Sequence, residues 1–440
     1  MVGAKMSLDP LRAQSAPRTS SSGVSGARSR TRKARVLFVN DTARNGGPGR
    51  SLFYILKFLD PEVIHRAVVL PREGVISELY ASSGITEELF FEPNLVENPV
   101  EPWNRAMERE DFDAPLVVRA ARAVGNVGRG AYGIARLTRL LRAGDYDLVY
   151  CNGTNACFAG GALARTSRVP ALWHVRYTSV PGALERVHAG LAASRGVRSI
   201  VCVSKASAAL FPHCPEKVKV IHNALDVEEF APRGVVPRLR QELGLPEGTV
   251  VFGSQGRILP RKGYMEMVRA AKLMLDEMRE DERARVHFAV LGDTPEDMRP
   301  DHLEECRALV RELGIEKRFT FMGFQIDVKP YVVDFDVAVV PSVYADPLPR
   351  AVIESMALGK PVVAFDVGGV AEMLRHGEDG ALVRGTPPDV PGLAHEMLRY
   401  ARDPAMRARH GQAARLRIET DFDSRAQARR IQEEILRVAR

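Results

Sequence analysis

Short runs of apolar and β-branched residues recur along this chain, and each run ends in a polar or glycine-containing turn. A first set spans 36–39, 148–151, 171–173, 200–203 and 218–221, and a second set spans 250–252, 286–290, 319–321, 337–340 and 361–365. Nearly continuous apolar strands separated by helix-length stretches are typical of a parallel sheet covered on both faces. The pattern therefore predicts an α/β chain with two doubly wound domains.

A stretch rich in Pro, Arg and Gly separates the two sets of strands and sets the expected domain boundaries. We expect a basic tail at 1–34, an N-terminal domain at 35–230, a linker at 231–248, a C-terminal domain at 249–402 and a helical segment at 403–440. Ligands of open parallel sheets bind outside the carboxyl ends of the strands. Because each domain has one such edge, we expect the ligand to lie in a cleft between the two domains.

The formal net charge of +7 is concentrated in the tail at 1–34, where seven basic side chains stand against one acid, Asp9. The rest of the chain is nearly neutral and lacks the basic field with which non-specific nucleic-acid binders neutralise phosphates. We therefore expect no nucleic-acid partner. The Ser- and Arg-rich tail is expected to be disordered, and an organelle transit peptide is the alternative.

The cysteines and the hydropathy pattern indicate the compartment. Five cysteines lie mostly in apolar segments without a Cys-x-x-Cys pair, which is typical of a reducing compartment. We find neither an uncharged apolar run of about 18 residues nor a secretory signal, so a cytoplasmic protein is expected. Residues 116–142 form a basic amphipathic segment interrupted by four glycines. Peripheral contact with an anionic membrane and packing on the sheet are both open interpretations of it.

Two loops at the expected carboxyl edges carry glycine or cations. Gly46 and Gly47 follow the first strand and open an amphipathic helix, where backbone N–H groups can hold an anion; a tight turn without a ligand is the alternative. Arg257 and Lys262 follow the first strand of the second domain. Arginine and lysine at such an edge suit a diphosphate leaving group, with a solvated basic loop as the alternative.

A second candidate segment follows the strand at 337–340. Pro349 fits the first position of a helix, so Asp346 lies in the preceding loop and Glu354 in the second helical turn. The free amides of Arg350 and Ala351 then point into the cleft as an anion site. Two acids and a helix start would meet there.

These motifs together resemble glycosyltransferase family 4. The resemblance rests on the 256–263 loop, on Gly323-Phe324-Gln325, and on an acid-x7-Glu pattern before Gly-Lys-Pro-Val-Val-Ala at 359–364. It implies the GT-B fold, in which two Rossmann-like domains face each other across a cleft. It also implies a retaining, metal-independent hexosyl transfer from a nucleotide-diphosphate sugar, a UDP- or GDP-sugar, without a cofactor. The acceptor, whether glycan, lipid-linked or a small molecule, is not identified.

The resemblance also assigns roles to individual residues. Arg257 and Lys262 would neutralise the donor diphosphate, and Glu354 would accept hydrogen bonds from the nucleotide ribose. Asp346 stands where the family usually has Glu and would hold hydroxyls of the transferred sugar, while His174 matches the family histidine that contacts that sugar. The other expected substrate-binding residues are Gly46, Gly47, Phe324, Gln325, Leu348, Arg350 and Ala351.

Other functions remain alternatives to this interpretation. A GT-B nucleotide-sugar epimerase is one, and an inactive sugar-binding subunit of a synthase complex is another, because Asp346 is one methylene shorter than the usual Glu. The Asp-x-Asp pairs at 145–147 and 334–336 precede their strands, which places them at the amino edge of the sheets. We interpret them as turn residues and expect no metal site. The histidines show no zinc spacing either.

Overall fold

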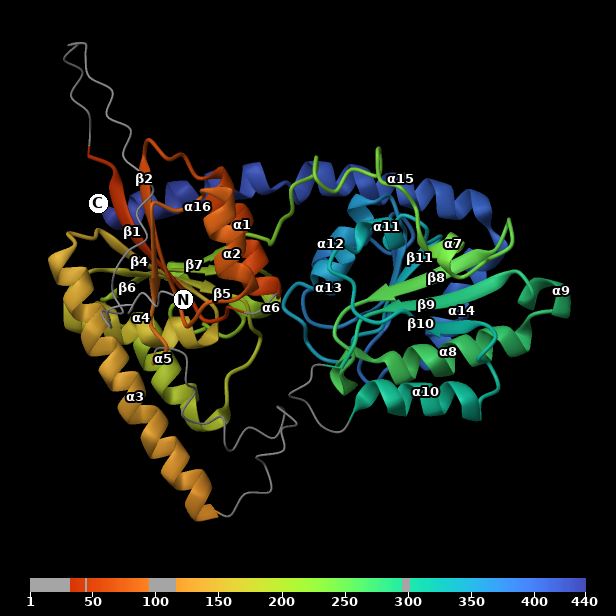
Figure 1. Ribbon diagram of the computed structural model, residues 1–440, viewed down its shortest axis with the longest axis horizontal. Helices are drawn as coiled ribbons and strands as arrows, with labels where there is room; N and C mark the ends of the chain where they lie inside the picture. Colours follow the sequence, from red (N-terminus) through yellow and green to blue (C-terminus); the bar gives the residue numbers. More distant parts are fainter. Residues whose placement is uncertain (1–31, 44–45, 95–115, 295–300) are drawn as a thin grey trace, which may run out of the picture.

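The computed structural model describes residues 32–43, 46–94, 116–294 and 301–440, so nearly all of the expected tail lies outside the described residues. Two α/β domains lie side by side, and the last two helices run along both of them (Figure 1). The predicted fold class is confirmed.

The N-terminal domain is built on a seven-stranded, all-parallel sheet with the order β3-β2-β1-β4-β5-β6-β7. Its strands are β1 (Ala34–Asn40), β2 (Ile64–Leu70), β3 (Glu88–Phe91), β4 (Leu148–Asn152), β5 (Ala171–Val175), β6 (Val197–Cys202) and β7 (Val218–Val220). Its helices are α1 (Gly47–Phe58), α2 (Val75–Ser83), α3 (Leu116–Ala143), α4 (Thr154–Ser167), α5 (Glu185–Ala193) and α6 (Lys205–Ala208), with 3-10 turns η3 (Gly182–Leu184) and η4 (Pro215–Lys217).

The C-terminal domain repeats this plan with a six-stranded parallel sheet in the order β10-β9-β8-β11-β12-β13. Its strands are β8 (Val250–Gln255), β9 (Val286–Leu291), β10 (Phe319–Phe321), β11 (Val337–Val340), β12 (Val362–Asp366) and β13 (Gly380–Arg384). Its helical elements are α7 (Leu239–Glu242), η5 (Pro260–Lys262), α8 (Tyr264–Glu277), α9 (Glu280–Arg283), α10 (His302–Glu312), α11 (Lys329–Val332), α12 (Arg350–Ala357), α13 (Val370–Met373) and α14 (Val390–Arg402).

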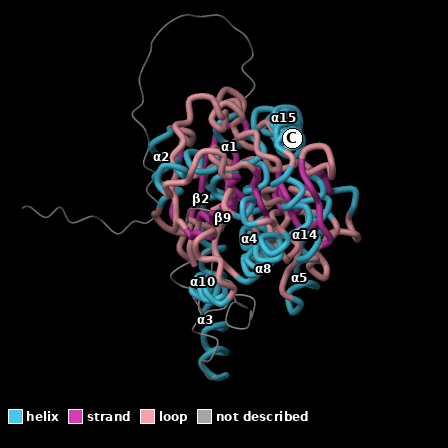
Figure 2. The backbone as a smooth tube through the Cα atoms, turned by 90° about the vertical axis from the view of Figure 1, so that its right-hand side faces the viewer, coloured by secondary structure: helices cyan, strands magenta, loops and turns pink. Residues whose placement is uncertain are grey.

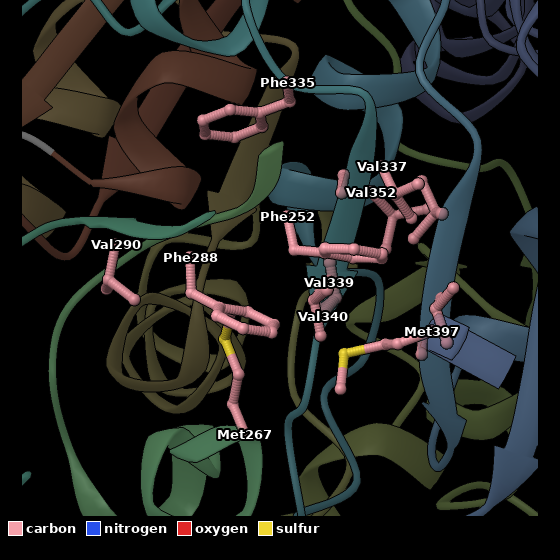
Figure 3. Packing of buried hydrophobic residues seen from close by; sticks show 14 of the residues in the cluster. Phe252, Met267, Phe288, Val290, Phe335, Val337, Val339, Val340, Val352 and Met397 are labelled. Carbon is pink, nitrogen blue, oxygen red and sulfur yellow. The ribbon is translucent and has the colours of Figure 1, made fainter. Parts of the chain in front are cut away.

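Every residue of β8 and β9 is buried, so the sheet of the C-terminal domain is covered on both faces. Phe252 and Phe288 of neighbouring strands stack with ring centroids 5.5 Å apart, and Met267 of α8 and Met397 of α14 lie close to them (Figure 3). Burial on both faces explains why these strands read as continuous apolar runs.

The strand order places the loops that matter for ligand binding. In both sheets the order reverses next to the first strand, between β1 and β4 and between β8 and β11. Loops that follow the first strands therefore open at the switch point, where doubly wound sheets form their crevice. The Asp-x-Asp pairs lie at the opposite edge, as predicted. Asp147 accepts the Arg35 amide at 2.8 Å and Asp336 accepts the Val251 amide at 2.7 Å, so both carboxylates hold the starts of first strands.

Helix α3 covers one side of the N-terminal domain and then projects from it, as both views show (Figures 1 and 2). Leu137 and Leu141 are buried toward its end, whereas Val124, Val127 and Tyr132 are exposed nearer its start. The segment at 116–142 thus packs on the domain over part of its length only. Within the described ranges, no helix has the length and apolar character needed to cross a membrane.

The segment at 403–440 consists of two helices that serve different domains. Helix α15 (Pro404–Asp421) lies on the C-terminal domain, and α16 (Ser424–Ala439) packs on α1 of the N-terminal domain (Figure 1). Between these two helices the chain is hydrogen-bonded to the end of the segment that leads from the N-terminal domain to the linker. The Leu225 amide donates to the Phe422 carbonyl at 3.1 Å, and the Leu225 carbonyl accepts from the Ser424 amide at 2.9 Å. The two segments of chain that connect the domains are therefore hydrogen-bonded to each other.

We expect Ile435→Ala to lower the free energy of unfolding by about 2–5 kcal/mol, because Ile435 is fully buried in the N-terminal core although it belongs to the last helix. Leu416→Ala is the matched control, since Leu416 of α15 is 64% exposed and should change stability by less than about 0.5 kcal/mol. Urea unfolding of both variants measures the difference. Equal effects would show that α16 does not stabilise the N-terminal domain.

Candidate active site

A cleft of 460 Å³ opens between the two domains at the carboxyl edges of both sheets. Every site residue expected from the sequence lines it except His174: these are Gly46, Gly47, Arg257, Lys262, Phe324, Gln325, Asp346, Leu348, Arg350, Ala351 and Glu354. Residues as far apart in the chain as Gly46 and Glu354 thus meet because both sheets direct their carboxyl ends here.

The basic loop after β8 owes its shape to a close backbone approach. Gly263 ends η5 with φ of +73°, and a Cβ there would lie 1.8 Å from the Pro341 carbonyl oxygen. Only glycine fits both constraints. The loop therefore lies against the end of β11, and Lys262 reaches the segment that follows that strand.

Lys262 and Asp346 form the central ion pair of the cleft. The Lys262 Nζ donates to Asp346 Oδ2 at 2.7 Å, and the Tyr344 hydroxyl donates to the same oxygen at 2.8 Å. Burial, and then the negative charge of Asp346, raise the pKa of Tyr344, so its hydroxyl stays protonated and remains a donor. The Arg261 guanidinium lies 5.2 Å from the Tyr344 ring centroid, which adds a cation–π contact.

The acid at the other end of the acid-x7-Glu pattern is held by α12. Arg350 donates from Nε to Glu354 Oε1 at 2.9 Å, and Gln255 donates to Oε2 at 3.2 Å. The Arg350 guanidinium also lies 5.5 Å from the ring of Tyr54 in the opposite domain. A carboxylate oxygen can accept more than one hydrogen bond, so Glu354 retains capacity for a ligand hydroxyl.

The start of α12 differs by one residue from the expectation. Pro349 is not the first helical residue but precedes it, with ψ of 123°, and its carbonyl accepts from the Val352 amide at 3.1 Å. Its carbonyl accepts a helical hydrogen bond while its own backbone is extended, which is the geometry of an N-cap residue. The amides of Arg350 and Ala351 still open the helix at the cleft.

His174 lies one layer beneath the cleft, because β5 continues through it to Val175. It is 1% exposed, and its Nδ1 meets the Tyr150 hydroxyl and the Arg176 guanidinium. Burial and the charge of Arg176 hold the pKa of His174 well below its ordinary value, so the ring is neutral. Its Nε2 has no hydrogen-bond partner among the described residues.

The sequence interpretation did not include Arg176, Asn223, Tyr344 and Arg50, all of which line the cleft. The signal for Arg176 was present, since it directly follows β5 and carboxyl edges collect ligand-binding residues. Among the residues that the structure describes, no three His, Cys, Asp or Glu side chains gather so as to hold a metal ion.

Comparison with solved structures defines the fold of this two-domain chain. The Anabaena protein Alr3699/HepE in complex with UDP covers 92% of this chain with 100% of its own, at a TM-score of 0.73 and 23% identity. Sucrose-phosphate synthase from Thermosynechococcus elongatus covers 92% of this chain with 99% of its own, at a TM-score of 0.70 and 19% identity. The chain has the GT-B fold of such enzymes.

Sequence comparison identifies the family. Residues 100–229 match Glycosyltransferase Family 4 and residues 235–417 match Glycosyl transferases group 1, so the chain belongs to glycosyltransferase family 4. D-inositol 3-phosphate glycosyltransferase of Kribbella flavida is 34% identical over 46% of this chain and 46% of its own length. The 2-deoxystreptamine glucosyltransferase of Streptomyces kanamyceticus is 33% identical over 43% of this chain and 46% of its own length. The matched region thus spans about half the length of these relatives.

We expect Gly263→Ala to destabilise the protein more than Gly314→Ala. Both glycines have similar left-handed φ angles, +73° and +66°, but a Cβ at Gly314 meets nothing within 4 Å. Each variant loses the left-handed freedom of glycine, about 1–2 kcal/mol, and the contact with Pro341 adds about 1–3 kcal/mol at Gly263 only. Urea denaturation of the two proteins measures this difference. Equal losses would refute the close approach.

Proposed function

We propose that this protein transfers a hexose from a nucleotide-diphosphate sugar to an acceptor hydroxyl, with retention of anomeric configuration and without a metal ion. The observation that carries the proposal is the ion pair between Lys262 Nζ and Asp346 Oδ2, which are 2.7 Å apart. This pair lies in an interdomain cleft that the first residues of α12 also line. The solved complexes of the Anabaena protein with UDP and with UDP-glucose support a nucleotide-sugar donor.

The cations of the 256–263 loop supply the electrostatics for departure of the diphosphate. As the bond between the anomeric carbon and the donor phosphate breaks, negative charge grows on the phosphate oxygens. Arg257 and Lys262 would neutralise that charge, and the amides that open α12 would donate to it. The acceptor oxygen then bonds to the anomeric carbon on the same face, and its proton passes to the departing phosphate.

The two acids of the cleft would serve different parts of the donor. Asp346 accepts hydrogen bonds from Lys262 and Tyr344, and we propose that it also accepts from hydroxyls of the transferred sugar. Glu354 lies in the second turn of α12, between Gln255 and Arg350, where it would accept from the ribose. His174, whose Nε2 has no hydrogen-bond partner among the described residues, would donate to a hydroxyl of the transferred sugar.

We expect Arg257→Gln and Lys262→Met each to lower turnover by at least about 100-fold, the usual cost of removing a group that stabilises transition-state charge. Arg279→Gln is the control, because the Arg279 side chain is 74% exposed and does not line the cleft. Product formation from a panel of UDP- and GDP-sugars is the measurement, and added chelator should leave the parent rate unchanged.

Three results would contradict this proposal. Turnover of both variants within about twofold of the control would remove the cations from the mechanism. Loss of activity with chelator and recovery with Mg²⁺ or Mn²⁺ would remove metal independence. Conversion of the donor sugar to its epimer without an acceptor would favour an epimerase, and the absence of any turnover while the donor still binds would favour a sugar-binding subunit.

Asp346→Asn and Glu354→Gln should change different kinetic constants. A ribose contact is made equally in ground and transition states, so Glu354→Gln should raise KM by about tenfold with little change in kcat. Asp346→Asn alters groups beside the anomeric carbon and should mainly lower kcat. Steady-state kinetics with saturating acceptor separates the two, and coincident or reversed profiles would contradict the division of roles.

A further inference from the structure

Arg176 is a half-buried cation that lines the cleft from the N-terminal domain, and the described residues give it only neutral hydrogen-bond partners. Its Nε donates to Asn152 Oδ1 at 2.5 Å, one Nη donates to Asn223 Oδ1, and the other lies 3.3 Å from His174 Nδ1. We propose that the acceptor carries an anionic group, a phosphate or a carboxylate, that binds Arg176. This inference rests on the proposed function and names the acceptor class for the same cleft.

The network around Arg176 holds the guanidinium in place but gives it no carboxylate as a hydrogen-bond partner. Asn152 is fully buried and donates to Asn40 Oδ1 at 2.5 Å and to the Pro48 carbonyl at 3.1 Å, so its own oxygen is left to accept from Arg176. Burial lowers the pKa of Arg176 to about 10. Buried charges in folded proteins are normally paired, because desolvation without a partner is costly. A ligand anion would supply the missing partner.

Asp41 and Glu229 are candidate counter-ions for Arg176, but both have other partners. Asp41 influences Arg176 electrostatically, but it accepts the Asn155 amide at 3.2 Å at the start of α4 and does not line the cleft. Burial raises the pKa of Asp41 to about 6, so this carboxyl group loses its charge only as the pH falls toward that value. Glu229 does line the cleft, but the Tyr54 hydroxyl donates to it at 3.0 Å and Lys57 lies 3.9 Å away.

A second cation reaches the same region from the opposite domain. The Cδ of Arg350 lies 3.8 Å from the position of a Cβ on Gly47, so this side chain extends to the start of α1. The Arg350 Nη2 forms an ion pair with Glu354 Oε1 at 2.8 Å, whereas its Nη1 is buried without a hydrogen-bond partner among the described residues. The charges of Arg350 and Arg176 repel each other. An anion between them would relieve that repulsion and satisfy donors from both domains.

The placement of the cations favours the acceptor over the donor as the source of this anion. Arg257 and Lys262, which we propose bind the donor diphosphate, belong to the C-terminal domain, whereas Arg176 belongs to the N-terminal domain. The names of two relatives specify acceptors of opposite charge, because inositol 3-phosphate is an anion and 2-deoxystreptamine carries protonated amines. The positive charges of Arg176 and Arg350 would attract an anionic acceptor such as inositol 3-phosphate and repel a cationic acceptor such as 2-deoxystreptamine.

The test is calorimetric titration of the full-length protein after saturation with UDP, which occupies the donor site. The probes are inositol 3-phosphate, its uncharged match inositol, inorganic phosphate and 2-deoxystreptamine. We expect the parent to bind the phosphorylated probe at least tenfold more tightly than inositol and not to bind 2-deoxystreptamine. Arg176→Gln should abolish that preference while the affinity for UDP stays within twofold of the parent value.

Arg176→Lys provides a second variant that keeps the charge in case Arg176→Gln does not fold, as judged by its circular dichroism. It loses the two-pronged geometry, so binding of the phosphorylated probe should weaken at least threefold. The inference is overturned if the parent shows no preference for phosphate, if neither variant changes it, or if the variants weaken UDP instead, which would assign the anion to the donor. Failure of the parent to bind UDP would contradict the proposed function, whereas binding of UDP without the phosphate preference contradicts this inference alone.

Discussion

The approach of Gly263 to the Pro341 carbonyl is the constraint on which the candidate site depends. It presses the loop after β8 against the end of β11, with no space for a side chain. Lys262 thereby reaches Asp346 at 2.7 Å, and Asp346 is in turn shared with Tyr344. One backbone contact thus brings the cations that follow β8 next to Asp346 and the start of α12, which follow the neighbouring strand β11.

The central strands of both sheets were predictable because burial on two faces leaves an unmistakable apolar run. Strands β2, β3 and β13 were not predicted. In β2 the polar residues His65 and Arg66 interrupt the run. Arg66 is tolerated because its guanidinium donates to Glu87, just before β3, at 2.8 Å and to the Leu56 carbonyl at 3.1 Å. Such compensation between strands belongs to tertiary structure. For the same reason the sequence predicted a helical segment at 403–440 but not which domain each of its helices packs against.

The site was largely predictable because carboxyl edges of parallel strands collect ligand-binding residues. The exceptions come from single-residue shifts. Continuation of β5 to Val175 buries His174 and brings Arg176 to the cleft instead. Likewise, the extended backbone of Pro349 moves the start of α12 to Arg350. Strand and helix ends depend on local backbone geometry, which residue type alone does not determine.

The central claim is that the cations of the 256–263 loop and the first amides of α12 form a diphosphate site between the domains. A crystal structure of the protein with UDP tests it most directly. The account predicts a β-phosphate oxygen within about 3 Å of Lys262 Nζ and another within that distance of the Arg350 or Ala351 amide. A diphosphate ordered elsewhere, with Lys262 still paired only to Asp346, would contradict it.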